Sequence, residues 1–342
     1  MLKAKDLAKE FGISPAAMSL IINDKPGVSD KTREDVILRM NAMGYGHLLK
    51  NNSYGETAPK KNITFVIYHD GGELLGANNN SFFPFIIDGI ERCARRHGYN
   101  LTYLNISREK VNEQIDLITQ SNCVGYIVFA TEMNGNQIDP FINLGIPFVL
   151  LDAYYNNRDV NSVTVNNEQG TYLAVEHLVN SGHKKIGYLT SGLELTSFVD
   201  RRYWAFKAMK AFGLTGMEQY KYEIGYPDTE AYVGMKALLE SCAELPTAFL
   251  TDNDLIAVGA MRALKEAGYR IPEDISFVGF DDRPVCTMVE PPLTTVQIPR
   301  NSFGAEAVEL LLRQIEGGTE CIVKTELNNK LIVRDSVAKL KK

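Results

Sequence analysis

The sequence predicts a small all-helical domain at the N-terminus, followed by a two-lobed, doubly wound α/β domain. Residues 1–44 contain three short stretches with apolar side chains at helical spacing. From residue 62 onward, short β-branched and aromatic runs alternate with amphipathic helical stretches, which is typical of a parallel sheet covered by helices on both faces. These runs are too many for one sheet, and a polar loop near 156–162 separates two comparable halves.

The N-terminal helices are short and closely spaced. Apolar residues share one face of the first helix, and Gly12 follows where a left-handed residue would end it. Ser14 offers an N-cap oxygen and Pro15 suits the first position of a second helix, which runs to residue 22. A third helix is capped by Ser29 and ends at Gly44. Such a tight helix pair presents its second helix to the DNA major groove, although a three-helix protein-interaction module has the same spacing.

Nine apolar runs are expected to be strands of the α/β domain. They are 62–68, 100–106, 124–130, 146–152, 162–167, 184–191, 247–253, 275–281 and 294–299. We place a headpiece at 1–50, a linker at 51–61 and the α/β domain at 62–342. Lobe 1 takes about 62–160 plus 293–320, and lobe 2 takes about 163–290 plus the C-terminal segment. Ligands of open α/β sheets bind outside the strand C-termini, so two lobes predict a binding cleft.

Charge and composition restrict the classes of function. The net charge of the chain is −6, but residues 1–60 carry nine Lys or Arg and seven Asp or Glu. This segment therefore has a net charge of +2 and the rest of the chain a net charge of −8. No apolar run approaches a membrane span, and the N-terminus lacks a signal peptide's apolar core, so we expect a cytoplasmic protein. The five cysteines are odd in number and widely spread, and we expect them in the core, without disulfides or a metal site.

Motifs of enzymes with this fold are not found in the sequence. It contains neither G-x-G-x-x-G after the first strand, nor a phosphate-binding loop, a nucleophile elbow or H-E-x-x-H. We therefore expect no catalysis, no cofactor and no metal. A periplasmic sugar-binding protein would share the two lobes, but it would need a signal peptide and would lack the headpiece.

The segment from Lys3 to Tyr45 resembles the headpiece of the lactose/galactose repressor family. It matches D-x-A-x-x-x-G-[VI]-S, S-x-x-[IV]-N, V-S-x-x-T-R and the closing G-Y of that family. Later stretches, above all TDNDLIAVGA, IPEDISFVGFDD and PPLTTV, resemble the same family, and the likeness covers nearly the whole chain. The resemblance implies a periplasmic-binding-protein-like (type I) fold, operator-DNA binding, a homodimer and a small, sugar-like effector.

By that resemblance, a set of headpiece side chains meets DNA. Those expected on phosphates are Ser14, Ser19, Asn23, Ser29, Thr32 and Tyr45, and those expected at base edges are Ala16, Ala17 and Leu20. The family usually carries longer polar residues near these base-edge positions, so we expect an A/T-rich operator or weak specificity. The family's hinge-helix motif is replaced by GHLLKNNSY, which leaves open whether 46–58 forms a helix.

A sugar presents adjacent hydroxyls and an apolar ring face, which suit carboxylate, amide and guanidinium groups together with an aromatic ring. The resemblance implies an effector set of Asn80, Phe82, Phe83, Asp152, Arg202, Asn253 and Asp281. Structural alternatives stay open: helix capping for the amide, core packing for the two rings, and a solvated surface for the arginine. A purine, an amino acid, a phosphorylated metabolite or a protein also remains open as effector, as does a sugar-binding module without regulatory DNA binding.

Overall fold

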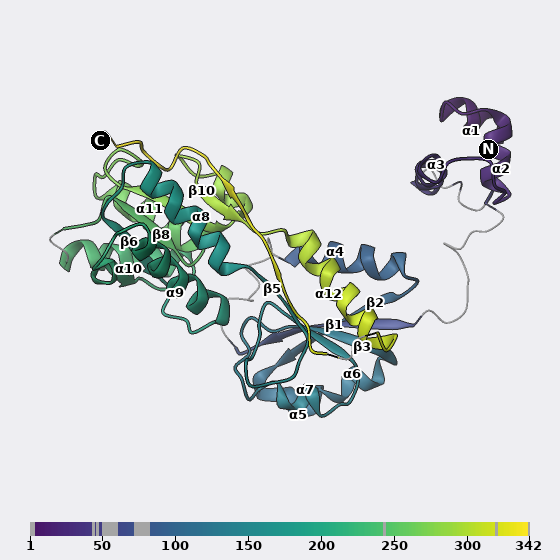
Figure 1. Cartoon of the computed structure of the whole chain (residues 1–342), viewed down its shortest axis with the longest axis horizontal. Helices are drawn as coiled ribbons and strands as arrows, with labels where there is room; N and C mark the ends of the chain where they lie inside the picture. The colour runs from purple at the N-terminus through teal and green to yellow at the C-terminus, as the bar shows by residue number, and fades with distance from the viewer. Residues whose placement is uncertain are drawn as a thin grey trace. The chain divides into compact units, whose positions relative to one another are not determined.

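The computed structural model describes residues 4–42, 45, 48–49, 61–71, 83–241, 244–318 and 321–340. The chain divides into two compact units, 1–60 and 61–342 (Figure 1). The expected linker, the open question of a helix over 46–58, and Asn80 and Phe82 fall wholly or mostly outside the described residues. None of the described helices is long and apolar enough to cross a membrane.

The first unit contains three helices, α1 (Ala4–Glu10), α2 (Pro15–Ile22) and α3 (Asp30–Ala42). The first two are separated by a turn in which Gly12 has a φ of +69°, the left-handed conformation that the sequence predicts there. Ser14 caps α2, because its Oγ accepts a hydrogen bond from the backbone nitrogen of Ala17 at 3.0 Å. Apolar side chains from all three helices form one small core, which includes Leu7, Met18 and Val36.

The second unit contains two six-stranded sheets with the same strand order. The first sheet has the order β11-β5-β4-β3-β1-β2, with strands β1 (Asn62–His69), β2 (Asn100–Ser107), β3 (Cys123–Phe129), β4 (Phe148–Leu151), β5 (Ser162–Val165) and β11 (Lys324–Leu327). The second has the order β12-β10-β9-β8-β6-β7, with strands β6 (Ile186–Thr190), β7 (Lys221–Glu223), β8 (Ala248–Thr251), β9 (Ser276–Asp281), β10 (Thr294–Gln297) and β12 (Lys330–Ile332). All pairings are parallel except that of β12 with β10.

Helices cover the sheets, as the alternating sequence pattern predicts. The first sheet carries α4 (Phe83–Arg96), α5 (Val111–Gln114), α6 (Asp116–Gln120), α7 (Asp139–Ile142) and α12 (Arg300–Ile315). The second carries α8 (Asn167–Asn180), α9 (Thr196–Ala211), α10 (Asp228–Ser241) and α11 (Asp254–Glu266). Helices α4 and α12 lie side by side although they are far apart in the sequence (Figure 1). Short 3₁₀ helices η3 (Arg108–Lys110), η4 (Met217–Tyr220) and η5 (Pro284–Thr287) complete the unit.

The chain passes between the two sheets after β5, after β10 and after β11. The sequence predicts the first two of these crossovers a few residues earlier in the chain, near residues 160 and 293. The difference arises because β5 pairs with β4 and so completes the first sheet, and because β10 pairs with β9 and so stays in the second. Strand β11 also belongs to the first sheet, which extends lobe 1 beyond the predicted 293–320.

Polar side chains tie the first and third crossovers together. Asn329 Nδ2 donates to the carbonyl of Asn166 at 2.7 Å, and Gln169 Oε1 accepts from the backbone nitrogen of Asn329 at 2.9 Å. Gly170 lies against this junction. A Cβ there would come within 2.8 Å of the Phe280 ring and 2.9 Å of Asn329 Nδ2. The two connections therefore form one tightly packed hinge region.

Candidate functional site

The C-terminal ends of strands in the second sheet carry the candidate polar residues. Asp281 ends β9 and is buried, with a φ of +109° that lies outside ordinary strand geometry. Its carboxylate forms an ion pair with Arg201 at 3.2 Å and another with Arg283 at 3.5 Å. A buried carboxylate needs such partners, because an unpaired charge in the interior is very costly.

Arg201 is the guanidinium that reaches this site, whereas the sequence pointed to Arg202. The side chain of Arg201 is buried and donates to Asn167 Oδ1 at 3.0 Å and to the carbonyl of Asp252 at 2.7 Å. Arg202 instead donates to Thr190 Oγ1 at 2.9 Å and pairs with Glu194 at 2.8 Å. Adjacent residues on a helix point in directions about 100° apart, so only one of the two arginines can face Asp281.

Phe280 and Arg201 form a second contact that affects which ligands fit. The guanidinium carbon of Arg201 lies 3.8 Å from the centroid of the Phe280 ring, which is typical of cation–π stacking. One face of this ring is therefore covered by protein. At this point the groups that can contact a ligand are polar: the guanidinium of Arg201 and the neighbouring carboxylate of Asp281.

Asp152, at the end of β4, brings the first lobe to the same site. It is buried with a φ of +69°, and its Oδ2 accepts a hydrogen bond from Thr131 Oγ1 at 2.5 Å. Burial raises the pKa of Asp152 to about 6, while Arg201 lowers it and Asp281 raises it electrostatically. Asp152 is therefore within electrostatic range of the Arg201–Asp281 pair of the second lobe. The Tyr154 hydroxyl also reaches the second lobe, donating to Asp200 at 3.3 Å.

The Asp252–Asp254 segment has mainly structural partners. Asn253 is the N-cap of α11, because its Oδ1 accepts from the backbone nitrogen of Ile256 at 3.2 Å, so the capping alternative describes its side-chain oxygen. Asp254 is fully buried and accepts from Thr295 Oγ1 at 2.5 Å and from the backbone nitrogen of Arg283 at 2.8 Å. Burial and the nearby Asp281 raise the pKa of Asp254. Both residues therefore have structural roles: Asn253 caps α11, and Asp254 binds the Thr295 side chain and the backbone of Arg283.

Phe83 begins α4 and packs into the core. Its ring lies edge-on against Phe129, with centroids 5.0 Å apart and planes at 72°. Phe83 therefore packs in the core, which is the structural alternative to ligand stacking that the sequence leaves open for this ring. Asn80 and Phe82, the other members predicted from this segment, lie outside the described residues.

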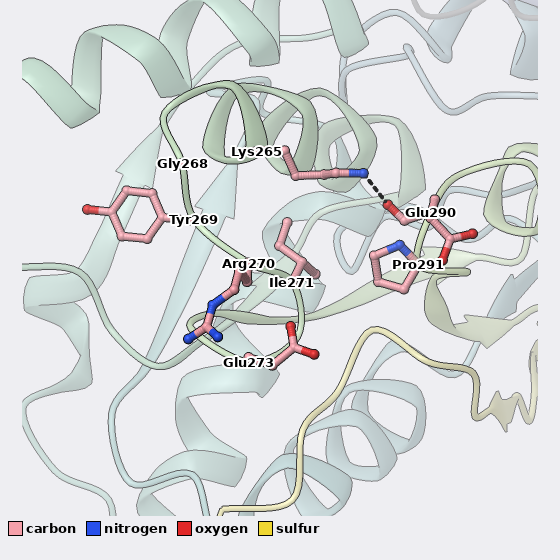
Figure 2. A pocket seen from close by; sticks show the side chains of 8 residues that line it. All are labelled: Lys265, Gly268, Tyr269, Arg270, Ile271, Glu273, Glu290 and Pro291. Atoms are coloured by element: carbon pink, nitrogen blue, oxygen red, sulfur yellow. Dashed lines mark hydrogen bonds between the residues drawn. The ribbon is translucent and has the colours of Figure 1, made fainter.

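A surface pocket on the second lobe is separate from these residues. It has a volume of about 420 Å³ and is lined by the end of α11, the loop that follows it and Glu290–Pro291 (Figure 2). Lys265 Nζ donates to the carbonyl of Glu290 at 2.8 Å across one wall. The pocket shares no residue with the candidate effector set.

In the N-terminal unit, the expected DNA-facing residues lie on α2, at its two ends, and on the segments from Ser29 to Tyr45. Ser14, Ala16 and Ser19 are exposed, while Ala17, Leu20, Asn23, Thr32 and Tyr45 are half-buried. Asn23 Nδ2 donates to the carbonyl of Ser19 at 2.8 Å, and Ser29 Oγ lies 2.8 Å from Thr32 Oγ1. Three of the expected phosphate contacts therefore also order the turn after α2 and the start of α3.

Comparisons with known proteins agree with this architecture. Residues 175–337 match the family described as a periplasmic binding protein-like domain. The chain is 30% identical over 344 residues to the HTH-type transcriptional repressor PurR of Haemophilus influenzae, covering 98% of this chain and 99% of the relative. The chain belongs to the lactose/galactose repressor family.

Solved structures of the lactose/galactose repressor family superpose on the chain. The lac repressor dimer bound to operator and the anti-inducer ONPF matches with a TM-score of 0.69 and 25% identity, covering 98% of this chain and 99% of that one. A family regulator from Enterococcus faecium with bound ribose matches with a TM-score of 0.68 and 25% identity, covering 81% of this chain and all of the other. These family members are transcriptional regulators and not enzymes.

Proposed function

We propose that this family member is a DNA-binding repressor whose operator affinity is set by a small, hydroxyl-rich effector, most simply a sugar, held between Asp152, Arg201 and Asp281. The observation that carries the proposal is the buried Arg201–Asp281 ion pair, with Asp152 of the other lobe in electrostatic contact with both. Adjacent hydroxyls of a sugar can accept from a guanidinium and donate to a carboxylate at the same time.

The arrangement favours a sugar over a purine as the effector. Among the described residues, Arg201 covers one face of the Phe280 ring and Phe83 packs edge-on against Phe129, so these two rings offer little stacking either to a flat base or to the apolar face of a sugar. The carboxylates and the guanidinium instead offer several directional polar contacts. The ribose bound to the Enterococcus faecium regulator supports the same choice. A purine remains the second candidate, because the same carboxylate and guanidinium groups can also bind a base edge.

We further propose that the chain acts as a cytoplasmic homodimer whose two headpieces bind a palindromic operator. The lac repressor dimer on its operator supports this assembly. Effector bound by both lobes would favour one arrangement of the lobes, and the three crossovers would carry that preference toward the headpieces. Couplings of this kind usually amount to about 1–3 kcal/mol.

A thermal-shift screen of the purified full chain tests the effector class. The panel contains pentoses, hexoses, disaccharides, purines and phosphorylated sugars. A ligand present at about 100 times its Kd adds about 2.7 kcal/mol to the free energy of unfolding. A sugar response that disappears in Asp281→Asn but persists in Arg202→Lys supports the proposal. A response to purines alone, or to none of these compounds, would overturn the sugar assignment.

Selection from random DNA tests the headpiece. Ala16 is exposed on α2 and Ala17 and Leu20 are half-buried, and such side chains offer apolar contacts to thymine methyl groups and no donors to guanine. We expect an A/T-rich half-site, read twice with two-fold symmetry. Enrichment of a G/C-rich motif would contradict this account of the base contacts while leaving the effector proposal intact.

A further inference from the structure

A cysteine, a histidine and a glutamate meet between α4 and α12. Cys93 lies in the last turn of α4, His97 directly follows the end of that helix, and Glu309 comes from α12. Cys93 Sγ lies 3.3 Å from Glu309 Oε1, and His97 Nε2 lies 3.1 Å from the same oxygen. The three potential ligand atoms all lie within 4.8 Å of one another.

These separations suit a single small metal ion. Zinc bonds to thiolate sulfur at about 2.3 Å and to histidine nitrogen or carboxylate oxygen at about 2.0–2.2 Å, so tetrahedral ligand atoms lie roughly 3.3–3.8 Å apart. The two pairs that involve Glu309, at 3.3 and 3.1 Å, lie within a fraction of an ångström of this range, and the partly exposed His97 side chain can adjust its distance from Cys93. Thiolate, imidazole and carboxylate together favour zinc or a similar thiophilic ion over calcium or magnesium.

The two helices hold the ligands in place through close backbone packing. A Cβ added at Gly89 would lie 2.1 Å from the carbonyl oxygen of Asn301, and one added at Gly304 would lie 2.3 Å from that of Ile86. Glycines at both positions therefore let α4 and α12 approach closely. The cluster lies farther along the same helix pair, so its three ligand groups are positioned before any ion arrives.

We propose that Cys93, His97 and Glu309 form a divalent-metal site that links α4 to α12, with zinc as the preferred ion. Cys93 is buried, whereas His97 and Glu309 are 38% and 41% exposed. An ion would therefore have three protein ligands and a fourth position open to water. Glu306, one turn before Glu309, is held by Arg313 at 3.2 Å and is not required.

Hydrogen-bonding contacts already join the three side chains. The Cys93 thiol donates to Glu309 Oε1, and His97 Nε2 lies within hydrogen-bonding distance of the same oxygen. Ligation releases the thiol proton, and the ion replaces it as the partner of both Sγ and the carboxylate.

Titration of the reduced, metal-free full chain with Co²⁺ and Zn²⁺ tests the proposal. We expect one Co²⁺ per chain with a sulfur-to-cobalt charge-transfer band and visible d–d bands of a tetrahedral ion, displaced by one equivalent of Zn²⁺. The side chains of His97 and Glu309 are partly exposed, so the His97→Gln and Glu309→Gln variants should fold normally. Each substitution should raise the Kd for Zn²⁺ at least tenfold. Cys93→Ser should also abolish the charge-transfer band.

Cys321→Ser is the matched control, because Cys321 is an exposed free cysteine outside the cluster. It should leave stoichiometry, spectrum and affinity unchanged. Binding that persists with the same spectrum in His97→Gln, or a charge-transfer band that disappears only in Cys321→Ser, would overturn the assignment. Substoichiometric binding without a charge-transfer band would do the same, since it would indicate adventitious surface binding.

Discussion

The two lobes have the same strand order but contribute unequally to the candidate effector site. At its strand ends the second lobe buries a dense polar network in which Asp254 is held by Thr295 and Arg283, and Asp281 is paired with Arg201. Among the described residues of the candidate set, the first lobe contributes one buried carboxylate, Asp152, with one hydroxyl partner. We therefore propose different roles for the two lobes, in which the second lobe holds the ligand-binding groups in a fixed geometry and the first lobe completes the site.

The two neighbouring arginines of α9 give the sharpest test of this asymmetry. Removing one partner of a buried ion pair leaves an uncompensated charge, so Arg201→Ala should lower the free energy of unfolding by about 3 kcal/mol. Arg202→Ala removes a partly exposed pair with Glu194 and should cost no more than about 1 kcal/mol. Urea unfolding of both variants measures the difference. Equal losses would mean that the polar network is not concentrated around Arg201.

The hinge region between the lobes is tested by Gly170→Ala. The added methyl group would overlap the Phe280 ring and Asn329, and we expect a loss of about 1–3 kcal/mol because of overpacking. Gly135→Ala is the control, since its Cβ would meet nothing closer than 3.8 Å. Thermal unfolding of the pair gives the comparison. If both variants behave alike, the first and third crossovers are not tightly coupled.

The first lobe's carboxylate should give the protein a pH-dependent stability. Burial raises the pKa of Asp152 from 3.8 to about 6, so the folded protein binds this proton more tightly than the unfolded chain does. Its contribution to the free energy of unfolding is present below about pH 4 and is lost as the pH rises through about 6. Asp152→Asn should therefore become more stable relative to the native chain between about pH 4.5 and about pH 7.5. An unchanged difference across that range would show that Asp152 is ionised throughout.

The smallest expected effect concerns the N-terminal unit, which lacks such buried networks among its described residues. Ser14→Ala removes the N-cap of α2 and should cost about 1 kcal/mol. Ser14→Asp should restore the cap but weaken DNA binding by placing a negative charge against phosphate. Circular dichroism of the isolated variants, followed by DNA titration, separates the two roles. A Ser14→Asp variant with native DNA affinity would remove Ser14 from the phosphate contacts.

The sequence predicts most of this fold because its signals are local. Nine strand runs, the glycine turn after α1 and the cap at Ser14 each follow from a few adjacent residues. The strands β7, β11 and β12 were not predicted, because they lie at sheet edges and are short and polar, with only partial burial. Strand pairing depends on partners far away in the chain, and for the same reason the two crossovers were placed a few residues too early.

The structure brings together only some of the residues that the sequence predicts for the effector site, which itself stays a prediction. Asp152 and Asp281 follow apolar runs, and their position at strand ends is a local signal. The choice between Arg201 and Arg202 depends on which helix face packs inward, and the Arg-Arg pair alone does not encode it. The prediction that the cysteines lie in the core holds for Cys93 and Cys286, which are buried, but not for the exposed Cys321. Cys93 also lies beside Glu309, whose segment is far away in the sequence. No local spacing motif could reveal that cluster.

We propose above all that a ligand bound by Arg201 and Asp281 controls DNA binding. The most direct test is a fluorescence-anisotropy titration of the selected operator with the native chain and with Asp281→Asn, each with and without the sugar found by thermal shift. We predict that the sugar changes the operator Kd of the native chain by about 5- to 150-fold, the range given by 1–3 kcal/mol of coupling. The variant should bind the operator with no response to the sugar. An equal response in both proteins, or none in the native chain, would contradict the account.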